Sequence, residues 1–215
     1  MSRSEQKSAA DFLPERKTLP SLKDALQGCR GCDLYRHATQ AVPGEGPRSS
    51  VIVFIGEQPG NDEDLQGRPF VGPAGRLFER ALKEAGIDRS AVYITNAVKH
   101  FKFEERGKRR MHKKPSASET TACRPWLEAE LAVIRPKVLV CLGATAAQSI
   151  FGRDYRLTKE RGQFVTHHVT HTWASQATST IHPSAILRAP DEQRTLEYQR
   201  FVEDLKKIRA AAEAI

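Results

Sequence analysis

The sequence predicts an α/β fold, a three-layer α/β/α sandwich in which helices cover both faces of a central, mostly parallel sheet. Apolar runs at residues 51–55 and 137–142 are too short for helices and are typical of buried strands. Each run leads through a glycine-containing turn or loop into a helical pattern, as in parallel α/β units. A length of 215 residues with 39% hydrophobic content suits one globular domain.

The two ends of the chain differ in character. Residues 1–19 mix charges, Ser and Ala without a sustained period, so we expect a loosely ordered lead-in. We expect residues 20–215 to form a single domain that includes a four-cysteine site. No apolar run approaches membrane-spanning length and the first residues lack the apolar core of a secretory signal, which predicts a cytoplasmic protein without a membrane partner.

The other elements follow from periodicity and from stop signals. Apolar residues at helical spacing predict helices over residues 73–85, which Gly86 ends, from Ser116 to residue 134, and from about Asp191 onward. We expect further strands at residues 92–95 and near 179–181, and an edge strand in the weakly alternating stretch 163–182.

The loop that follows the first strand, from Gly56 to Gly75, is long and rich in Gly, Pro and acidic residues. Ligands of parallel α/β sheets bind beyond the carboxyl ends of the strands, so a connection of this length indicates a binding loop. A solvated acidic loop is the alternative. Phe70 argues against it, because this aromatic residue lies between Pro69 and Val71 in an otherwise polar stretch.

Positive charge is concentrated in one segment. The chain has 34 Lys and Arg against 26 Asp and Glu, a net charge of +8 and an isoelectric point of about 9.5. Residues 99–114 contain eight Lys or Arg and two Glu. A solvated charged loop would explain such a run, but the interleaved Phe101, Phe103, His100 and His112 favour phosphate contacts beside base stacking, and so a nucleic-acid partner.

All four cysteines together suggest a metal site. Cys29 and Cys32 form a CxxC pair, and Cys123 and Cys141 follow far downstream with seventeen residues between them. Structural disulfides are disfavoured in the cytosol, so the set predicts a four-thiolate site for zinc or an iron–sulfur cluster. The wide second spacing favours the cluster over a zinc ribbon. Unrelated buried thiols are the alternative.

Several short motifs, in this order, are similar to those of the uracil-DNA glycosylase superfamily from about Gly28 to Leu187. They are GEQPG, GRPFVGPAG, TNAVKH, ACRPWL, LGATAA and HPS. The cysteines resemble those of the iron–sulfur branches. Gln58 and the inserted GKRRMHKKPS resemble the X branch, which cross-links itself to uracil-containing DNA. The family usually has Asp where Asn61 stands and Ile where Met111 stands.

The resemblance implies a 4Fe–4S cluster and uracil-containing, single-stranded DNA as the partner, with no obligate protein partner. It implies catalytic roles for His112, Glu57 and His182, and substrate binding by Gln58, Asp64, Phe70 and Asn96. It further implies DNA contacts from Lys108, Arg109, Arg110, Lys113 and Lys114, and cluster ligation by Cys29, Cys32, Cys123 and Cys141.

The chemistry of these side chains supports the implied roles. The enzyme must unstack the base, bind its edge and stabilise a leaving anion and a cationic sugar. Phe70 offers a stacking face, and the Asn96 amide can both donate and accept, matching O4 and N3–H of uracil but not cytosine. His182 can donate to O2, although a helix-start histidine bonded to backbone is a plain alternative.

His112 is the unusual residue. In a basic loop a histidine is usually a phosphate or solvent contact. The surrounding cations disfavour a further positive charge, so they should keep the imidazole neutral and nucleophilic, with Glu57 to orient it and to stabilise the cationic sugar. An imidazole bonded to C1′ leaves poorly, which predicts a persistent adduct. A water-using glycosylase and a non-catalytic nucleic-acid-binding module remain the alternatives.

Overall fold

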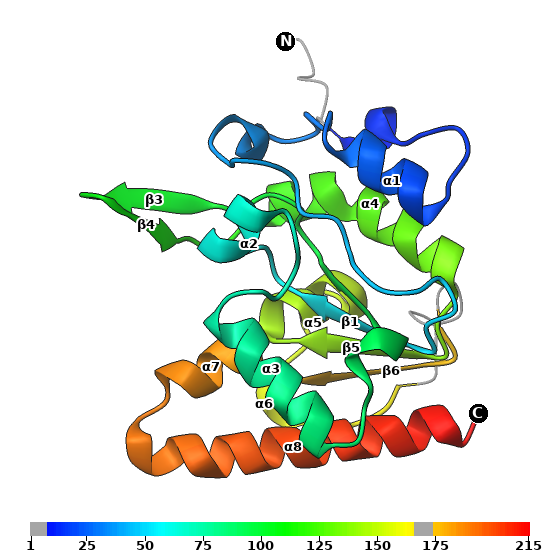
Figure 1. Ribbon diagram of the computed structural model, residues 1–215, viewed down its shortest axis with the longest axis vertical. Helices are drawn as coiled ribbons and strands as arrows, with labels where there is room; N and C mark the ends of the chain where they lie inside the picture. Colours follow the sequence, from blue (N-terminus) through cyan, green and yellow to red (C-terminus); the bar gives the residue numbers. More distant parts are fainter. Residues whose placement is uncertain (1–7, 166–173) are drawn as a thin grey trace.

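A computed structural model of the chain describes residues 8–165 and 174–215 and has the predicted α/β sandwich at its centre (Figure 1). A parallel sheet in the order β2-β1-β5-β6 is formed by β1 (Ile52–Gly56), β2 (Tyr93–Asn96), β5 (Val138–Leu142) and β6 (Gln176–Thr180). Every residue of the first three strands is buried, as expected for a sheet covered on both faces.

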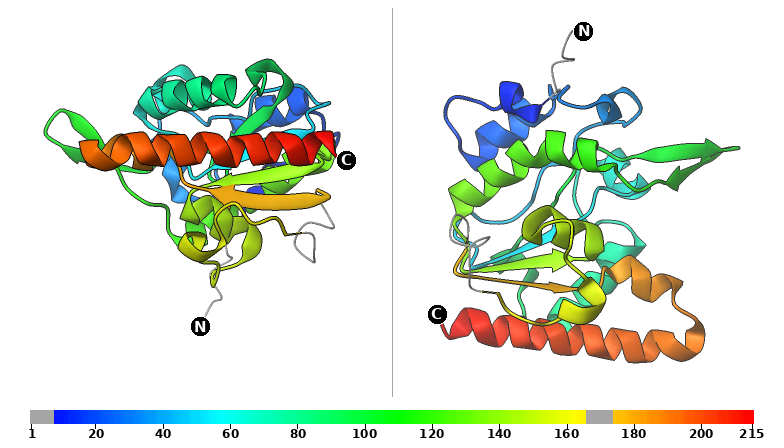
Figure 2. Two further views of the ribbon diagram at one scale, coloured as in Figure 1. Left: turned by 90° about the horizontal axis from the view of Figure 1, so that it is seen from below. Right: turned by 180° about the vertical axis from the view of Figure 1, so that it is seen from behind.

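Helices cover the two faces of the sheet (Figure 2). Side chains such as Phe54 and Val140 pack with α3 (Pro73–Glu84) and α8 (Asp191–Glu213), whereas Ile55 and Leu139 pack with α4 (Ala117–Ile134) and α5 (Ala144–Phe151). The alternation follows from the strand period of two. The shorter helical elements near these layers are α7 (Pro183–Arg188), α6 (Leu157–Glu160) and η3 (Arg89–Ala91).

The carboxyl ends of the strands meet at one edge of the sheet because all strand pairs are parallel. Gly56 pairs with Asn96, and Leu142 pairs with Thr180. The β1–β2 pairing continues into the loops, since Ala97 N–H donates to the Gly56 carbonyl at 2.9 Å and Val98 N–H to that of Glu57 at 3.0 Å. The first residues after the strands therefore lie side by side.

The amino-terminal part of the described chain is ordered, which corrects the expected loose lead-in for residues 8–19. The turn η1 (Ala9–Phe12) packs on α4 together with α1 (Leu19–Leu26), and η2 (Asp33–Arg36) follows. Ala9 is 1% exposed, and a Cβ on Gly31 would lie 2.6 Å from the Ala9 nitrogen. A glycine at position 31 thus permits the close packing that orders this segment. Residues 1–7 lie outside the described residues.

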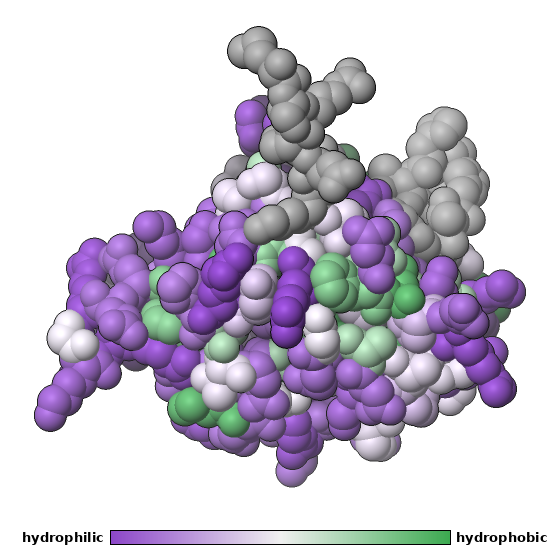
Figure 3. Space-filling model, turned by 90° about the horizontal axis from the view of Figure 1, so that it is seen from above, coloured by the Kyte–Doolittle hydropathy of each residue, from purple (hydrophilic) through white to green (hydrophobic). Residues whose placement is uncertain are grey.

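Two elements of the loops were not predicted. The helix α2 (Asn61–Gln66) lies inside the loop after β1, and an antiparallel hairpin, β3 (Phe103–Arg106) with β4 (Arg109–His112), lies inside the basic segment. The hairpin projects from the body beside α2 (Figure 1), and the projection at the left of the space-filling view is predominantly hydrophilic (Figure 3). Much of the edge strand expected in 163–182 falls on residues 166–173, outside the described residues.

In the part of the chain that the structure covers, no helix combines the length and the apolar character needed to cross a membrane.

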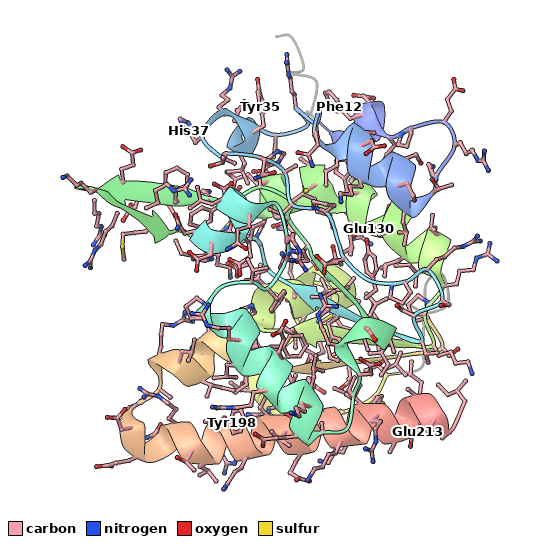
Figure 4. The ribbon with its side chains drawn as sticks, in the orientation of Figure 1. Phe12, Tyr35, His37, Glu130, Tyr198 and Glu213 are labelled. Carbon is pink, nitrogen blue, oxygen red and sulfur yellow. The ribbon has the colours of Figure 1, made fainter. Side chains whose placement is uncertain are left out.

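A buried ion pair joins α4 to the sheet. Lys99 is 0% exposed, and its Nζ donates to Glu130 Oε2 and to Thr95 Oγ1, both at 2.6 Å. Glu130, on the side of α4 that faces the sheet (Figure 4), also accepts from the Tyr93 hydroxyl at 3.2 Å and from the Gly44 N–H at 3.0 Å. The network fixes β2 and the segment after it relative to α4.

Replacing one member of this pair should destabilise the fold strongly. Lys99→Met leaves the Glu130 carboxylate buried without its cation, so we expect the free energy of unfolding to fall by about 3–5 kcal/mol in urea titrations. The matched control, Lys206→Met, removes an exposed pair with Glu203 and should cost less than about 1 kcal/mol. Equal losses of unfolding free energy in the two variants would contradict a stabilising role for the buried Lys99–Glu130 pair.

Candidate active site

A cavity of about 580 Å³ opens at the carboxyl edge of the sheet. The segments after all four strands contribute to its wall, as expected for a parallel α/β fold. Its lining includes most of the predicted catalytic and substrate-binding residues, namely Glu57, Gln58, Phe70, Asn96, His112 and His182.

Asn96 presents an unused hydrogen-bond acceptor to this cavity. Its side chain is almost fully buried, and its Oδ1 accepts no hydrogen bond within the described parts of the chain. Buried polar atoms are normally paired, so an unpaired acceptor in a cavity wall indicates a ligand that donates there. A Cβ on Gly56 would overlap this oxygen and lie 2.9 Å from Phe70 Cζ. Glycine at position 56 therefore leaves room for both side chains.

Phe70 is held in a strained conformation beside the cavity. Its φ is 57°, in the left-handed region that costs a bulky residue about 1–3 kcal/mol. The ring packs on Phe78 at 5.4 Å and lies 5.6 Å from the His182 ring. A Cβ on Gly75 would overlap the Phe70 carbonyl. Local packing thus fixes an aromatic face at the cavity wall.

The Glu63 carboxylate holds together the two ends of the loop that carries Phe70, because it accepts a hydrogen bond from a backbone amide at each end. Glu63 Oε1 accepts from the Gly72 N–H at 2.8 Å, and Oε2 accepts from the Gly60 N–H at 3.0 Å. Glu63 was not among the predicted site residues. The signal was only partial, because a Glu three residues after a helix start can accept from the N-cap backbone N–H, but Gly60 has no side chain to complete a capping box.

The tautomer of His182 follows from its hydrogen bonds. Its Nδ1 accepts from the Ser184 backbone N–H at 3.1 Å and lies 2.8 Å from the Ser184 hydroxyl. The ring proton is therefore on Nε2, which remains a donor. Burial lowers the pKa of His182 to about 4 against the opposing charge of Glu57, so the imidazole is neutral at physiological pH. His182 can therefore cap the start of α7 through Nδ1 and donate a hydrogen bond through Nε2 at the same time.

Glu57 and His112 come together across the cavity. Glu57 Oε1 lies 3.2 Å from His112 Nε2, and the Thr145 hydroxyl also donates to this carboxylate. Burial raises the pKa of Glu57, but the hydrogen bonds from His112 and Thr145 outweigh it and keep the pKa below its usual value. Glu57 is thus an anion oriented toward His112. Sequence reasoning did not identify Thr145, which stands in the LGATAA motif.

Gln58 clamps the base of the hairpin. Its Nε2 donates to the carbonyls of Lys102 and Lys113, both at 3.1 Å, and its Oε1 accepts from the Lys102 N–H at 3.0 Å. The side chain lines the cavity, but these three bonds use its amide. Gln58 therefore positions the strand that carries His112.

Asp64 and Arg110 form an ion pair with each other. Asp64 is 0% exposed and lies outside the cavity lining, and its carboxylate accepts from the Thr39 N–H and, at 2.7 Å, from Arg110. Arg110 also donates to Asn61 Oδ1 at 2.8 Å. These contacts fix the hairpin to α2, and substrate binding by Asp64 and a DNA contact from Arg110 stay predictions. The Asn61 side-chain oxygen accepts the hydrogen bond from Arg110 at the position where the family usually has Asp.

The other cations of the segment remain available. Lys108, Arg109 and Lys114 are exposed and form no ion pair with residues 8–165 or 174–215, and Lys113 lies 4.0 Å from Glu104. The basic hairpin therefore presents exposed positive charges beside the cavity, as phosphate binding requires.

The structure brings three of the four cysteines into one region. Cys29 and Cys123 are buried in the packing between the amino-terminal segment and α4, and Cys32 packs against the same group. Trp126 Nε1–H donates to Cys29 Sγ at 3.1 Å, and Lys99 N–H donates to Cys123 Sγ at 3.3 Å. Such N–H···S bonds are common around cluster sulfurs.

Cys141 does not join this group, which corrects the expected four-thiolate set. It lies on β5 and belongs to a different core cluster, in which the sheet packs against α5. Burial alone raises its pKa. Among the described residues no three His, Cys, Asp or Glu side chains are arranged to hold a metal ion. The Cys29–Cys32–Cys123 group fits a cluster in residue type and location but supplies only three ligands.

Comparison with known proteins agrees with the fold. Residues 43–206 match the model of the uracil DNA glycosylase superfamily, and the chain belongs to that family. A type-4 uracil-DNA glycosylase of Sulfurisphaera tokodaii is 37% identical over 91% of this chain and 85% of its own length. Proteins of the same name from Archaeoglobus fulgidus and Thermotoga maritima are each 37% identical, over 89% and 88% of this chain and 92% of their own lengths.

The space at Gly56 gives a sharp test of the cavity. Gly56→Ala keeps the backbone conformation accessible but places a methyl group against Asn96 Oδ1 and the Phe70 ring. We expect it to weaken binding of a single strand that carries a non-cleavable 2′-fluoro-arabino uridine by at least about tenfold, measured by fluorescence anisotropy. The control Gly28→Ala meets only an ordinary contact at 3.6 Å and should bind as wild type. Unchanged binding by Gly56→Ala would place the base elsewhere.

Proposed function

We propose that this protein excises uracil from DNA and becomes covalently linked through His112 to C1′ of the abasic sugar. The observation that carries the first part is the unpaired, buried Oδ1 of Asn96. Uracil N3–H would donate to this oxygen while the Asn96 amide donates to O4. Cytosine presents an acceptor at N3 and a donor at C4, so both contacts would become repulsive.

His182 stabilises the leaving group in this mechanism. The electron pair of the broken N-glycosidic bond departs with uracil, and negative charge develops on the base. His182 is a neutral donor through Nε2, and it can stabilise O2 without carrying a charge of its own. Phe70 supplies the face against which the unstacked base lies.

His112 supplies the nucleophile. The bond from C1′ to uracil N1 breaks first and leaves a cationic sugar. The unprotonated Nδ1 of His112, whose Nε2–H faces Glu57, then forms a bond to C1′, and the ring becomes an imidazolium. Glu57, an anion 3.2 Å from His112 Nε2, stabilises that charge and the cationic sugar before it, and accepts the remaining ring proton. The resulting alkylated imidazole is a poor leaving group, so the adduct persists.

Hydrolysis by water is the second candidate, and the relatives favour it, since the proteins that match along most of the chain are named type-4 uracil-DNA glycosylases. The same cavity supports it if a water molecule takes the place of His112 beside Glu57. In this chain the Gln58 clamp and the Arg110 anchor hold His112 at the carboxylate, which favours attack by the imidazole.

We propose single-stranded DNA as the preferred substrate. Extruding an unpaired base costs the least free energy, and the exposed Lys108, Arg109 and Lys114 suit a flexible phosphate backbone. Comparing the rate of uracil release from single-stranded DNA with the rate from duplex DNA of the same sequence tests this preference.

We further propose that Cys29, Cys32 and Cys123 bind an iron–sulfur cluster. The cluster would brace the amino-terminal segment against α4. His100 is the candidate for the fourth ligand, because it is buried and directly follows Lys99, whose N–H bonds to Cys123. The arrangement leaves Cys141 as an ordinary core residue.

Replacing the nucleophile should separate excision from linkage. In His112→Ser the groups that expel uracil remain, and space opens for water near Glu57. We expect uracil release without a shifted protein–DNA band on a denaturing gel, and repeated turnover. Lys108→Ser, at the hairpin tip, is the control and should still form the adduct. A shifted band in His112→Ser, or attachment mapped to another residue, would contradict the covalent role.

Iron content should distinguish the cysteines. We expect Cys29→Ser, Cys32→Ser, Cys123→Ser and His100→Ala to lose most iron and sulfide, along with the broad visible absorbance of a cluster. Cys141→Ser, the matched thiol control, should retain them because its side chain packs on the α5 side of the sheet. Iron loss from Cys141→Ser, or a zinc-loaded colourless wild type, would overturn this assignment.

A further inference from the structure

A second cavity, of about 290 Å³, lies between α4 and α5 and adjoins the first. Lys114 and Thr145 line both cavities. The Thr145 hydroxyl donates to Glu57, so one side chain contacts the candidate catalytic carboxylate and also forms part of the second wall. The two cavities are therefore neighbours along the surface, and nothing in the mechanism above uses the second.

The lining of the second cavity has the chemistry of a base site. Leu127, Leu131 and Ile150 are buried and provide apolar surface, while Thr121 and Gln148 contribute polar groups at the wall. A nucleobase has the matching character, with apolar faces and hydrogen-bonding edges.

The charges at this cavity suit a phosphate backbone. Lys114 and Arg153 line it, are exposed and form no ion pair with any residue in the described ranges. The one acid in the lining, Glu128, is paired with Arg124 at 2.7 Å. The cavity thus offers two available cations, with its single carboxylate already engaged.

We propose that the α4–α5 cavity binds the nucleotide adjacent to the target uracil in the same DNA strand. The inference rests on the proposed function, because the first cavity must hold the uracil. Continuity through Lys114 and Thr145 lets one strand enter both cavities, and stacking of the neighbouring base on the apolar surface would fix the position of the strand beside His112.

The test uses short single strands carrying a non-cleavable 2′-fluoro-arabino uridine, with an abasic unit on the 5′ side, on the 3′ side or on neither. We expect the base on one side to strengthen wild-type binding about tenfold, as burial of one base face against apolar side chains would. Thr121→Trp, which fills the cavity, should lose that factor with the intact strand and match wild type when the base is absent. Ala132→Trp, on an exposed part of α4 outside both linings, is the control.

Arg153→Ala should weaken binding several-fold and reduce its salt dependence, whereas Arg156→Ala, exposed and outside both linings, should not. Equal binding of all three strands, or equal binding by Thr121→Trp and wild type, would overturn the inference. Uracil release from the intact strand with ordinary deoxyuridine, measured separately in wild type, reports on the proposed function. Failure of that reaction is therefore distinguishable from failure of the neighbouring site.

Discussion

The parallel pairing of β1 with β2 is the constraint on which the candidate site depends. Because Gly56 pairs with Asn96, the loop that carries Glu57 and Phe70 starts beside the residue proposed to bind the uracil edge. A residue with a side chain at position 56 would displace the Asn96 amide and the Phe70 ring together. The parallel pairing of β5 with β6, in which Leu142 lies beside Thr180, brings the segment with His182 to the same edge.

The hairpin adds the nucleophile to this edge by a different means. It pairs with no strand of the central sheet, and two contacts fix it: the Gln58 amide holds its base, and Arg110 joins it to Asp64 and Asn61 of α2. Both anchors belong to the loop after β1, as does Glu57. The carboxylate and the hairpin are therefore positioned by one loop, which explains how an exposed histidine is held against a half-buried acid.

The regular elements were predictable because their apolar periodicity is strong. The strand over residues 137–142 and the helices from Pro73 and from Ser116 have the expected positions. The hairpin was missed because its strands consist mainly of Arg and Glu, without the alternation of polar and apolar residues that predicts a half-buried strand. Contacts between residues far apart in sequence, such as Arg110 with Asp64, leave no local signal.

The cysteines show a second limit of sequence reasoning. Spacing suggested that all four converge, but strand alternation decides where Cys141 points. Val138, Val140 and Leu142 pack on one face of the sheet, so Leu139 and Cys141 pack on the other, under α5. By contrast, Asn96 and His182 were predictable, because one ends a strand of a parallel sheet and the other lies two residues after such an end, and these positions meet at one edge.

The most direct test of the central claim is the intact mass of the wild-type protein after incubation with a uracil-containing single strand. The proposed mechanism predicts a single new species whose mass is that of protein plus DNA minus uracil, formed once per protein molecule. Unmodified protein together with free abasic DNA and released uracil would contradict covalent capture and assign the reaction to water.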